Sequence, residues 1–155
     1  MTSLETRIPP PLVAIVCAGL MSLVAQWITA PVLSLPASLR GLLIAALLCV
    51  AGFFALSAAL RFKRSATTID PRKPDTTHAL VTEGVYRWTR NPMYLGMALV
   101  LAAWGVYLLS VWSLLGVVVF VTYLNRFQIG PEERALRALF GAEFDTYCAT
   151  VRRWI

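Results

Sequence analysis

The stretch HALVTEGVYRWTRNPMYLG, residues 78–96, determines how this chain is built. Its first part is polar and charged, whereas its last part enters an apolar run without Asp, Glu, Lys or Arg before Arg126. A basic, aromatic segment that leads directly into a long apolar run is typical of a water–membrane boundary. Asn91 followed by Pro92 predicts a helix start there, because Asn caps free backbone N–H groups and Pro fits the first helical position.

The N-terminus of this predicted helix is suited to hold an anion. Its free N–H groups and the positive end of its dipole lie beside Arg87 and Arg90, where a carboxylate or a phosphate would be stabilised. The same surroundings have a purely structural explanation, because Arg, Trp and Tyr side chains such as Trp88 and Tyr94 commonly anchor proteins at membrane boundaries. These residues alone leave both explanations open.

The composition indicates an integral membrane protein. Of the 155 residues, 58% are hydrophobic and only 14% are charged, whereas about a quarter of the residues of soluble domains are charged. The net charge of +6 does not indicate nucleic acid, because the basic residues gather at the ends of apolar runs. The three cysteines form no CxxC pair, so we expect neither a disulfide framework nor a metal site. The apolar run after Pro11 is too long for a cleaved signal peptide and should remain as an anchor.

Uncharged runs of bilayer length predict an all-α integral membrane protein with four transmembrane helices arranged as two hairpins. About 20 apolar residues cross a bilayer core. The uncharged run from Asn91 to Asn125 would be about 50 Å long as one helix, so it must fold back. Leu109–Trp112 is the expected turn. The predicted spans are residues 12–32, 39–60, 93–109 and 112–127.

The distribution of Lys and Arg predicts the orientation. The loop 61–91 holds seven basic residues, and three of them, Arg61, Lys63 and Arg64, are expected to end the second span. Arg40 is the one basic residue in the opposite turns. Because an excess of Lys and Arg marks the cytoplasmic side, this loop and both termini are expected in the cytoplasm, at the inner membrane if the protein is bacterial.

The C-terminal region, residues 130–155, predicts a cytoplasmic amphipathic helix. This helix begins with Glu132 after Gly130–Pro131, and a second short helix, residues 142–147, follows it. The Arg pair and Trp154 near the chain end suit a membrane surface, so this tail is expected against the inner leaflet. Acidic residues are favoured in the first turn of any helix, which alone would explain Glu132 and Glu133. Residues 1–155 are expected to form a single domain.

Two separated motifs resemble those of a known group of enzymes. The first comprises His78-x-Leu80-Val81, Gly84-x-Tyr86 and Arg90-Asn91-Pro92-x-Tyr94-x-Gly96, and the second comprises Glu132-Glu133 with Leu136, Phe140-Gly141, Phe144, Tyr147 and Arg153. With a helical hairpin between them, they are similar to the isoprenylcysteine carboxyl methyltransferase and phospholipid N-methyltransferase superfamily of integral membrane enzymes. The resemblance covers about the C-terminal half of the chain.

The resemblance implies S-adenosylmethionine as methyl donor, bound from the cytoplasm, and a lipophilic or membrane-embedded acceptor that enters from the bilayer. It implies neither a metal nor nucleic acid. The donor carries a carboxylate that suits a helix N-terminus, and a sulfonium that aromatic faces such as those of Tyr86 or Tyr94 attract. In family terms the donor contacts are His78, Ala79, Leu80, Val81, Tyr86, Asn91, Pro92, Met93, Tyr94 and, as the acidic ligand, Glu132.

Two positions depart from the family pattern. Asn91 stands where the family often has His, so direct acid–base work at this position is not expected. Gln128 stands where the isoprenylcysteine enzymes have an Arg that binds the substrate carboxylate. Arg126 is two residues away, about 200° around a helix, and should not simply replace it. Gln128 and, secondarily, Arg126 are the expected acceptor contacts, and Glu133 is the one spare carboxylate nearby that could remove a proton.

The expected reaction is in-line methyl transfer in a dry pocket, where positioning of two bound reactants supplies much of the acceleration. Two alternatives stay open. The chain could be a non-catalytic membrane scaffold or sensor protein, or a membrane reductase, since sterol reductases share part of this architecture. Ligand binding separates these functions. A methyltransferase requires S-adenosylmethionine, a reductase requires a nicotinamide, and a scaffold or sensor requires neither.

Overall fold

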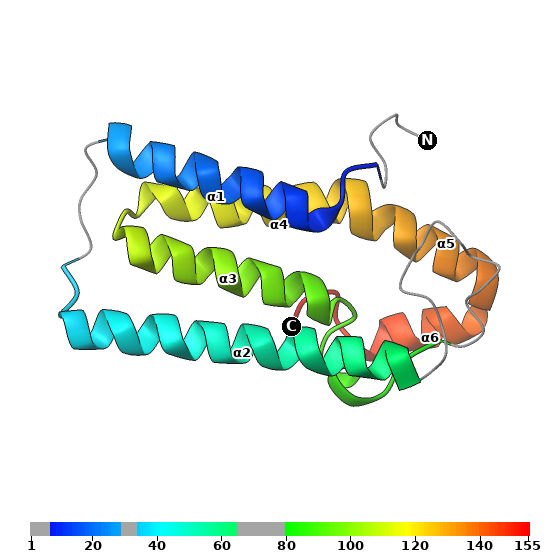
Figure 1. Cartoon of the computed structure of the whole chain (residues 1–155). Helices are drawn as coiled ribbons and strands as arrows, with labels where there is room; N and C mark the ends of the chain where they lie inside the picture. The colour runs from blue at the N-terminus through cyan, green and yellow to red at the C-terminus, as the bar shows by residue number, and fades with distance from the viewer. Residues whose placement is uncertain (1–6, 29–33, 65–79) are drawn as a thin grey trace.

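A computed structural model describes residues 7–28, 34–64 and 80–155, and these residues are helical with no strand among them. Four long helical segments run side by side, and two shorter helices extend from one end (Figure 1). The α-helices are α1 (Pro10–Trp27), α2 (Ala37–Arg64), α3 (Pro92–Leu108), α4 (Leu115–Leu124), α5 (Gly130–Phe140) and α6 (Ala142–Thr150). Shorter turns are η2 (Gly84–Arg87), η3 (Trp112–Leu114) and the π-helical η4 (Asn125–Ile129).

The described residues include three helices that are long and apolar enough to cross a membrane, namely Pro10–Trp27, Ala37–Arg61 and Trp112–Phe140. The helix α3 is equally apolar but has 17 residues. The described residues therefore include three to four helices able to span a bilayer, and the prediction of a helical membrane protein is confirmed.

One predicted span end was wrong. The helix α1 ends at Trp27 and not at Val32, because Ile28 has an extended backbone with φ −101° and ψ 109°. A proline hinders the helical carbonyl four residues before it, and Pro31 follows Trp27 by four residues. The helix α2 continues past Leu60 to Arg64. Arg and Lys are good helix formers, so these charges end the apolar stretch without ending the helix.

The predicted turn between the last two apolar runs is confirmed at Leu109–Trp112. Leu109 has the left-handed backbone conformation, with φ 54°, and ends α3. The buried Ser113 donates its hydroxyl to the carbonyl of Ser110 at 2.7 Å. This contact satisfies a backbone oxygen at the helix end and closes the reversal into η3 and α4.

The predicted break at Gly130–Pro131 was wrong, because η3, α4, η4 and α5 form one continuous helix from residue 112 to residue 140. In a regular α-helix Pro131 would lack one hydrogen bond and press on the carbonyl of Phe127. The chain avoids this with a π turn, in which the Gly130 N–H bonds to the carbonyl of Asn125. Such π turns are rare in proteins, and those that occur are often found at functional sites.

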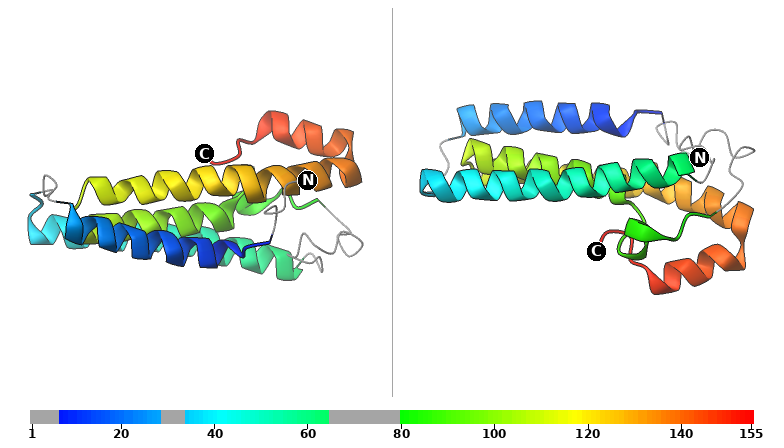
Figure 2. Two further views of the ribbon diagram at one scale, coloured as in Figure 1. Left: turned by 90° about the horizontal axis from the view of Figure 1, so that it is seen from above. Right: turned by 60° about the horizontal axis from the view of Figure 1, so that its bottom comes forward.

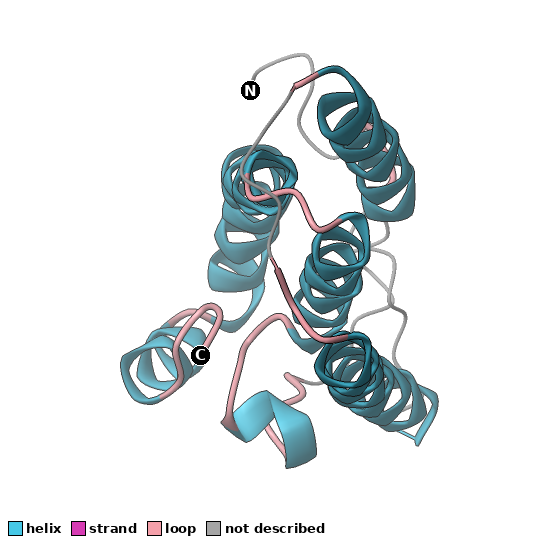
Figure 3. Cartoon of the chain, turned by 90° about the vertical axis from the view of Figure 1, so that its left-hand side faces the viewer, coloured by secondary structure: helices cyan, strands magenta, loops and turns pink. Residues whose placement is uncertain are grey.

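The predicted first hairpin was also wrong, since α3 lies between α1 and α2 (Figures 1 and 3). Small residues on α2 permit close helix packing against α3. A Cβ at Gly96 would lie 3.0 Å from the carbonyl of Ala51 and 3.5 Å from Cβ of Ala55. The glycine therefore brings the start of α3 directly against α2.

Two buried clusters hold the bundle together. The first joins α1 to α3 and α4 through Cys17, Met21, Leu101, Phe120 and Leu124, among others. The second lies where α2, η2 and α6 meet, and includes Phe54, Ala58, Val85, Phe144 and Tyr147. The second cluster fixes the polar segment that precedes α3 against the C-terminal helices.

The orientation remains a prediction, which reporter fusions can test. Fusions after Pro36 and Ser110 are expected to report the outside, and a fusion after Pro74 the cytoplasm, because the intervening loop carries half of the basic residues whereas the opposite turns carry only Arg40. The check is a paired alkaline phosphatase and green fluorescent protein assay at each position. The opposite pattern would place residues 80–91 and α6 outside and would contradict a donor site in the cytoplasm.

Candidate functional site

The segment from Leu80 to Asn91 brings the first motif to the end of the bundle. Leu80 and Val81 pack against the second buried cluster, and Tyr86 is buried within it. The Tyr147 hydroxyl on α6 donates to the carbonyl of Tyr86 at 2.7 Å. Burial raises the pKa of both phenols, so they stay protonated at neutral pH. His78 and Ala79, two of the expected donor contacts, lie outside the described residues.

Glu132 lies where the two motifs meet. The Tyr94 hydroxyl in the first turn of α3 donates to Glu132 Oε1 at 2.6 Å, and Gln128 Nε2 donates to the same oxygen at 2.7 Å. Glu132 Oε2 has no hydrogen-bond partner among the described residues. The structure therefore brings together three of the predicted site residues and leaves one carboxylate oxygen available.

Glu133, the next residue, has a different environment. Its Oε1 accepts from Arg90 Nη2 at 2.9 Å and from Arg153 Nε at 3.0 Å, and its Oε2 accepts from Arg153 Nη2 at 2.5 Å. The side chains of Arg90 and Glu133 are only 14% and 16% exposed. This carboxylate is thus fully engaged in two ion pairs that connect α5, the first motif and the chain end.

The last residues, Val151–Ile155, form a strap across the first motif. The helix α6 turns back at the end of α5 and returns the chain toward the bundle (Figure 2). Thr89 Oγ1 and Asn91 Nδ2 both donate to the carbonyl of Arg153, at 3.2 and 3.0 Å. Trp154 Nε1 donates to Asn125 Oδ1 in the π turn at 3.0 Å. These residues contact the protein itself, and their placement against the inner leaflet stays a prediction.

The side chain of Asn91 was expected to cap α3, and this expectation was wrong. The helix does begin at Pro92, yet Asn91 makes no side-chain cap hydrogen bond. Its amide is instead committed to the strap carbonyl. The first turn of α3, with Met93 and Tyr94, therefore keeps backbone N–H groups that no capping side chain satisfies.

The two arginines expected to form an anion site beside this helix start lie in different surroundings. Arg90 is engaged by Glu133, whereas Arg87 is exposed and lines a separate groove next to α2. Arg126 is also exposed, with its guanidinium 5.9 Å from the centre of the Phe127 ring, while Gln128 is buried. The two side chains thus face different surroundings, as the helical spacing predicted.

Thr89 and Trp154 are residues of this region to which sequence reasoning gave no hydrogen-bonding role. Their partners lie 64 and 29 residues away in the chain, so no local pattern could have revealed them. No group of three or more His, Cys, Asp or Glu side chains in the described ranges could hold a metal ion.

The region that contains this arrangement matches a known family. The model of the phospholipid methyltransferase family matches residues 39–143, from the start of α2 into α6. The chain belongs to this family. The matched region of this phospholipid methyltransferase family member contains Tyr94, Gln128, Glu132 and Glu133, whereas the strap lies beyond it.

One relative supports the comparison over a shorter region. An uncharacterized protein of Haemophilus influenzae is 43% identical over 63 residues, which cover 41% of this chain and all of that protein. The family assignment makes this chain a membrane methyltransferase by class.

Proposed function

We propose that the protein transfers a methyl group from S-adenosylmethionine to a lipophilic acceptor in the membrane. The observation that carries this proposal is the Glu132 carboxylate, which Tyr94 and Gln128 hold through one oxygen while the other stays available. Family membership supplies the reaction class.

The chemistry of the residues fits the donor. Glu132 Oε2 would accept hydrogen bonds from an ammonium or from ribose hydroxyls. The backbone N–H groups of Met93 and Tyr94 suit a carboxylate at the N-terminus of α3. When bound, S-adenosylmethionine supplies an electrophilic methyl group on a sulfonium. The aromatic faces of Tyr86 and Tyr94 would attract that cation.

The contacts of Glu133 favour a positioning role over that of a general base. Both oxygens of its carboxylate already accept hydrogen bonds from the guanidinium groups of Arg90 and Arg153, so neither oxygen is directed toward an acceptor. We therefore propose that the acceptor arrives with its nucleophile already deprotonated or uncharged. Bringing two bound reactants into attack geometry would then supply most of the acceleration.

The proposal includes one methyltransferase domain over residues 1–155, with the donor bound on the cytoplasmic side. The basic loop 61–91 supports this orientation. The exposed apolar surfaces of α1, α2 and α4 support entry of the acceptor from the bilayer.

A screen with methyl-labelled S-adenosylmethionine tests this function. Purified protein in lipid nanodiscs is expected to label lipophilic acceptors, and to label farnesylcysteine analogues weakly or not at all. Gln128 donates to Glu132 and cannot form the bidentate, charged clamp that Arg offers a carboxylate. Amine, thiol, lipid and prenylcysteine acceptors should be compared at equal concentration.

The control for this screen is the methyl ester of farnesylcysteine, which lacks the free carboxylate. Our interpretation of Gln128 would be contradicted if farnesylcysteine is labelled strongly and its methyl ester is not labelled. Binding of a nicotinamide in place of S-adenosylmethionine would favour the reductase alternative, and binding of neither would favour a scaffold.

A further inference from the structure

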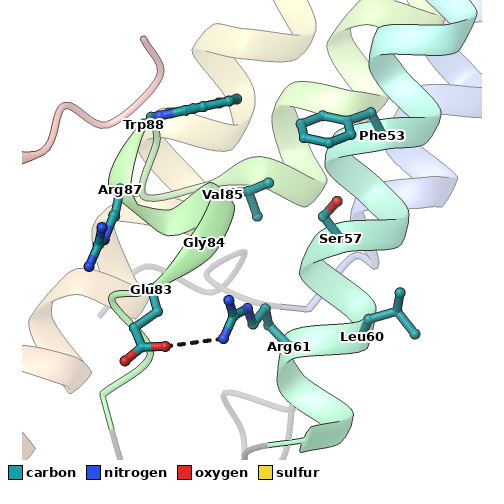
Figure 4. Close-up of a pocket in the computed structure, with 9 residues that line it drawn as sticks. All are labelled: Phe53, Ser57, Leu60, Arg61, Glu83, Gly84, Val85, Arg87 and Trp88. Carbon is teal, nitrogen blue, oxygen red and sulfur yellow. Dashed lines mark hydrogen bonds and ion pairs between the residues drawn. The ribbon is translucent and has the colours of Figure 1, made fainter.

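A groove of about 620 Å³ lies between the end of α2 and the η2 turn (Figure 4). Four of its lining residues come from α2 and five from residues 83–88. None of the residues that we propose to hold the methyl donor lines it. The groove is therefore separate from the Glu132 carboxylate.

The groove is apolar at one end and charged at the other. Phe53, Ser57 and Arg61 follow each other at intervals of four residues and so share one face of α2. The Phe53 ring lies 6.1 Å from the ring of Trp88, whereas Arg61 Nη1 donates to Glu83 Oε2 at 3.1 Å (Figure 4). A ligand in this groove would lie along α2 with its apolar part beside the rings.

The charged end has an excess of positive charge. Arg61 and Glu83 compensate each other. Arg87 is exposed and has no hydrogen-bond or ion-pair partner in residues 7–28, 34–64 and 80–155. The charges of Arg61, Glu83 and Arg87 sum to +1, so an anionic group beside Arg87 would neutralise this end of the groove.

Gly84 fixes the position of Arg61 in the groove wall. Its φ is +64°, which L side chains rarely adopt. A Cβ at this position would lie 2.9 Å from Arg61 Nε. The glycine thus lets the guanidinium of Arg61 rest on the backbone of η2, where it remains paired with Glu83.

We propose that this groove binds one membrane phospholipid with an anionic headgroup. Its phosphate would lie beside Arg87, and its chains would follow the apolar end past Phe53 and Trp88. Trp side chains are favoured at the headgroup level of membranes, and basic residues there attract anionic lipids. The volume is within the range of natural ligand pockets. Neither Gln128 nor Arg126, the expected acceptor contacts, lines the groove, so this lipid would be distinct from the methyl acceptor and its site does not depend on the proposed reaction.

Lipid retention by the full chain in detergent, followed by native mass spectrometry, tests the proposal. Dioleoylphosphatidylglycerol is the probe, and dioleoylglycerol and glycerol 3-phosphate are the comparison ligands. The wild type is expected to retain one dioleoylphosphatidylglycerol. Arg87→Gln should weaken this binding about fivefold, because a basic residue near an anionic surface contributes that much. Arg137→Gln is the matched control, since it removes an exposed guanidinium that does not line the groove.

Four outcomes would overturn the proposal. Equal weakening by Arg87→Gln and Arg137→Gln would indicate only an effect of overall charge. Equal retention of dioleoylglycerol would indicate that the headgroup is not recognised, and displacement by glycerol 3-phosphate would indicate a soluble phosphate. Ser57→Phe, which fills the middle of the groove, should abolish retention in a folded protein, and unchanged retention would place the lipid elsewhere.

Discussion

Replacing Glu132 with Gln is expected to lower the affinity for S-adenosylmethionine by about ten- to a hundredfold, because hydrogen bonds to a charged group contribute more than neutral ones. The stability of the protein should change little. The amide loses charge-assisted bonds from Tyr94 and Gln128, but it also removes the cost of keeping a charge in a partly buried site. Calorimetric titration of the donor and thermal unfolding of the same samples measure the two effects.

Glu143→Gln is the matched control for this experiment. Glu143 lies in the first turn of α6 and is exposed, so the substitution removes the same charge without changing Glu132, Tyr94 or Gln128. Donor affinity should remain that of the wild type. If a folded Glu132→Gln protein binds the donor as well as the control does, then Glu132 serves only to hold Tyr94 and Gln128 in place.

Replacing Glu133 with Ala is expected to destabilise the protein by about 3 kcal/mol, since it leaves the largely but not fully buried guanidinium of Arg90 without its counter-charge. It should also release the strap, whose Arg153 loses its partner. Chemical unfolding in detergent measures the first effect. Hydrogen exchange of the backbone N–H of Arg90, which bonds to the carbonyl of Arg152, measures the second.

The exposed ion pair between Arg137 and Asp145 provides the control. Both side chains are more than half exposed, so Asp145→Ala should change the stability far less than Glu133→Ala does. Arg153→Ala combined with Glu133→Ala should cost less than the sum of the single substitutions, because the two residues share one interaction. A Glu133→Ala protein with unchanged stability and strap protection but no methyl transfer would instead indicate a general base.

Local features of the fold could be predicted from the sequence. The start of α3 follows from Asn91-Pro92, and the reversal at Leu109–Trp112 follows from the length of the apolar run. The packing order of the helices could not be predicted in this way. The position of α3 between α1 and α2 depends on the match between Gly96 and the small residues of α2.

In the candidate site, too, some contacts could be predicted from the sequence and others could not. The two motifs that resemble the family carry Tyr94 and Glu132, so the meeting of these side chains in one site could be predicted from the sequence. The partners of Glu133 and Asn91 were beyond such reasoning. Asn91 and Arg153 are 62 residues apart, and the amide prefers the strap carbonyl to its own helix end only because α6 turns the chain back.

The orientation of the two adjacent carboxylates, Glu132 and Glu133, depends on the one extra residue that the π turn at Asn125–Ile129 contains. One π turn contains about one residue more than an α turn, and each residue advances a helix by about 100°. If the same residues wound as a plain α-helix, Glu132 and Glu133 would be rotated together by about 100°, away from Tyr94 and Arg90. The π turn takes up one extra residue and so keeps the helical segments on its two sides in the rotational phase that the two carboxylates require.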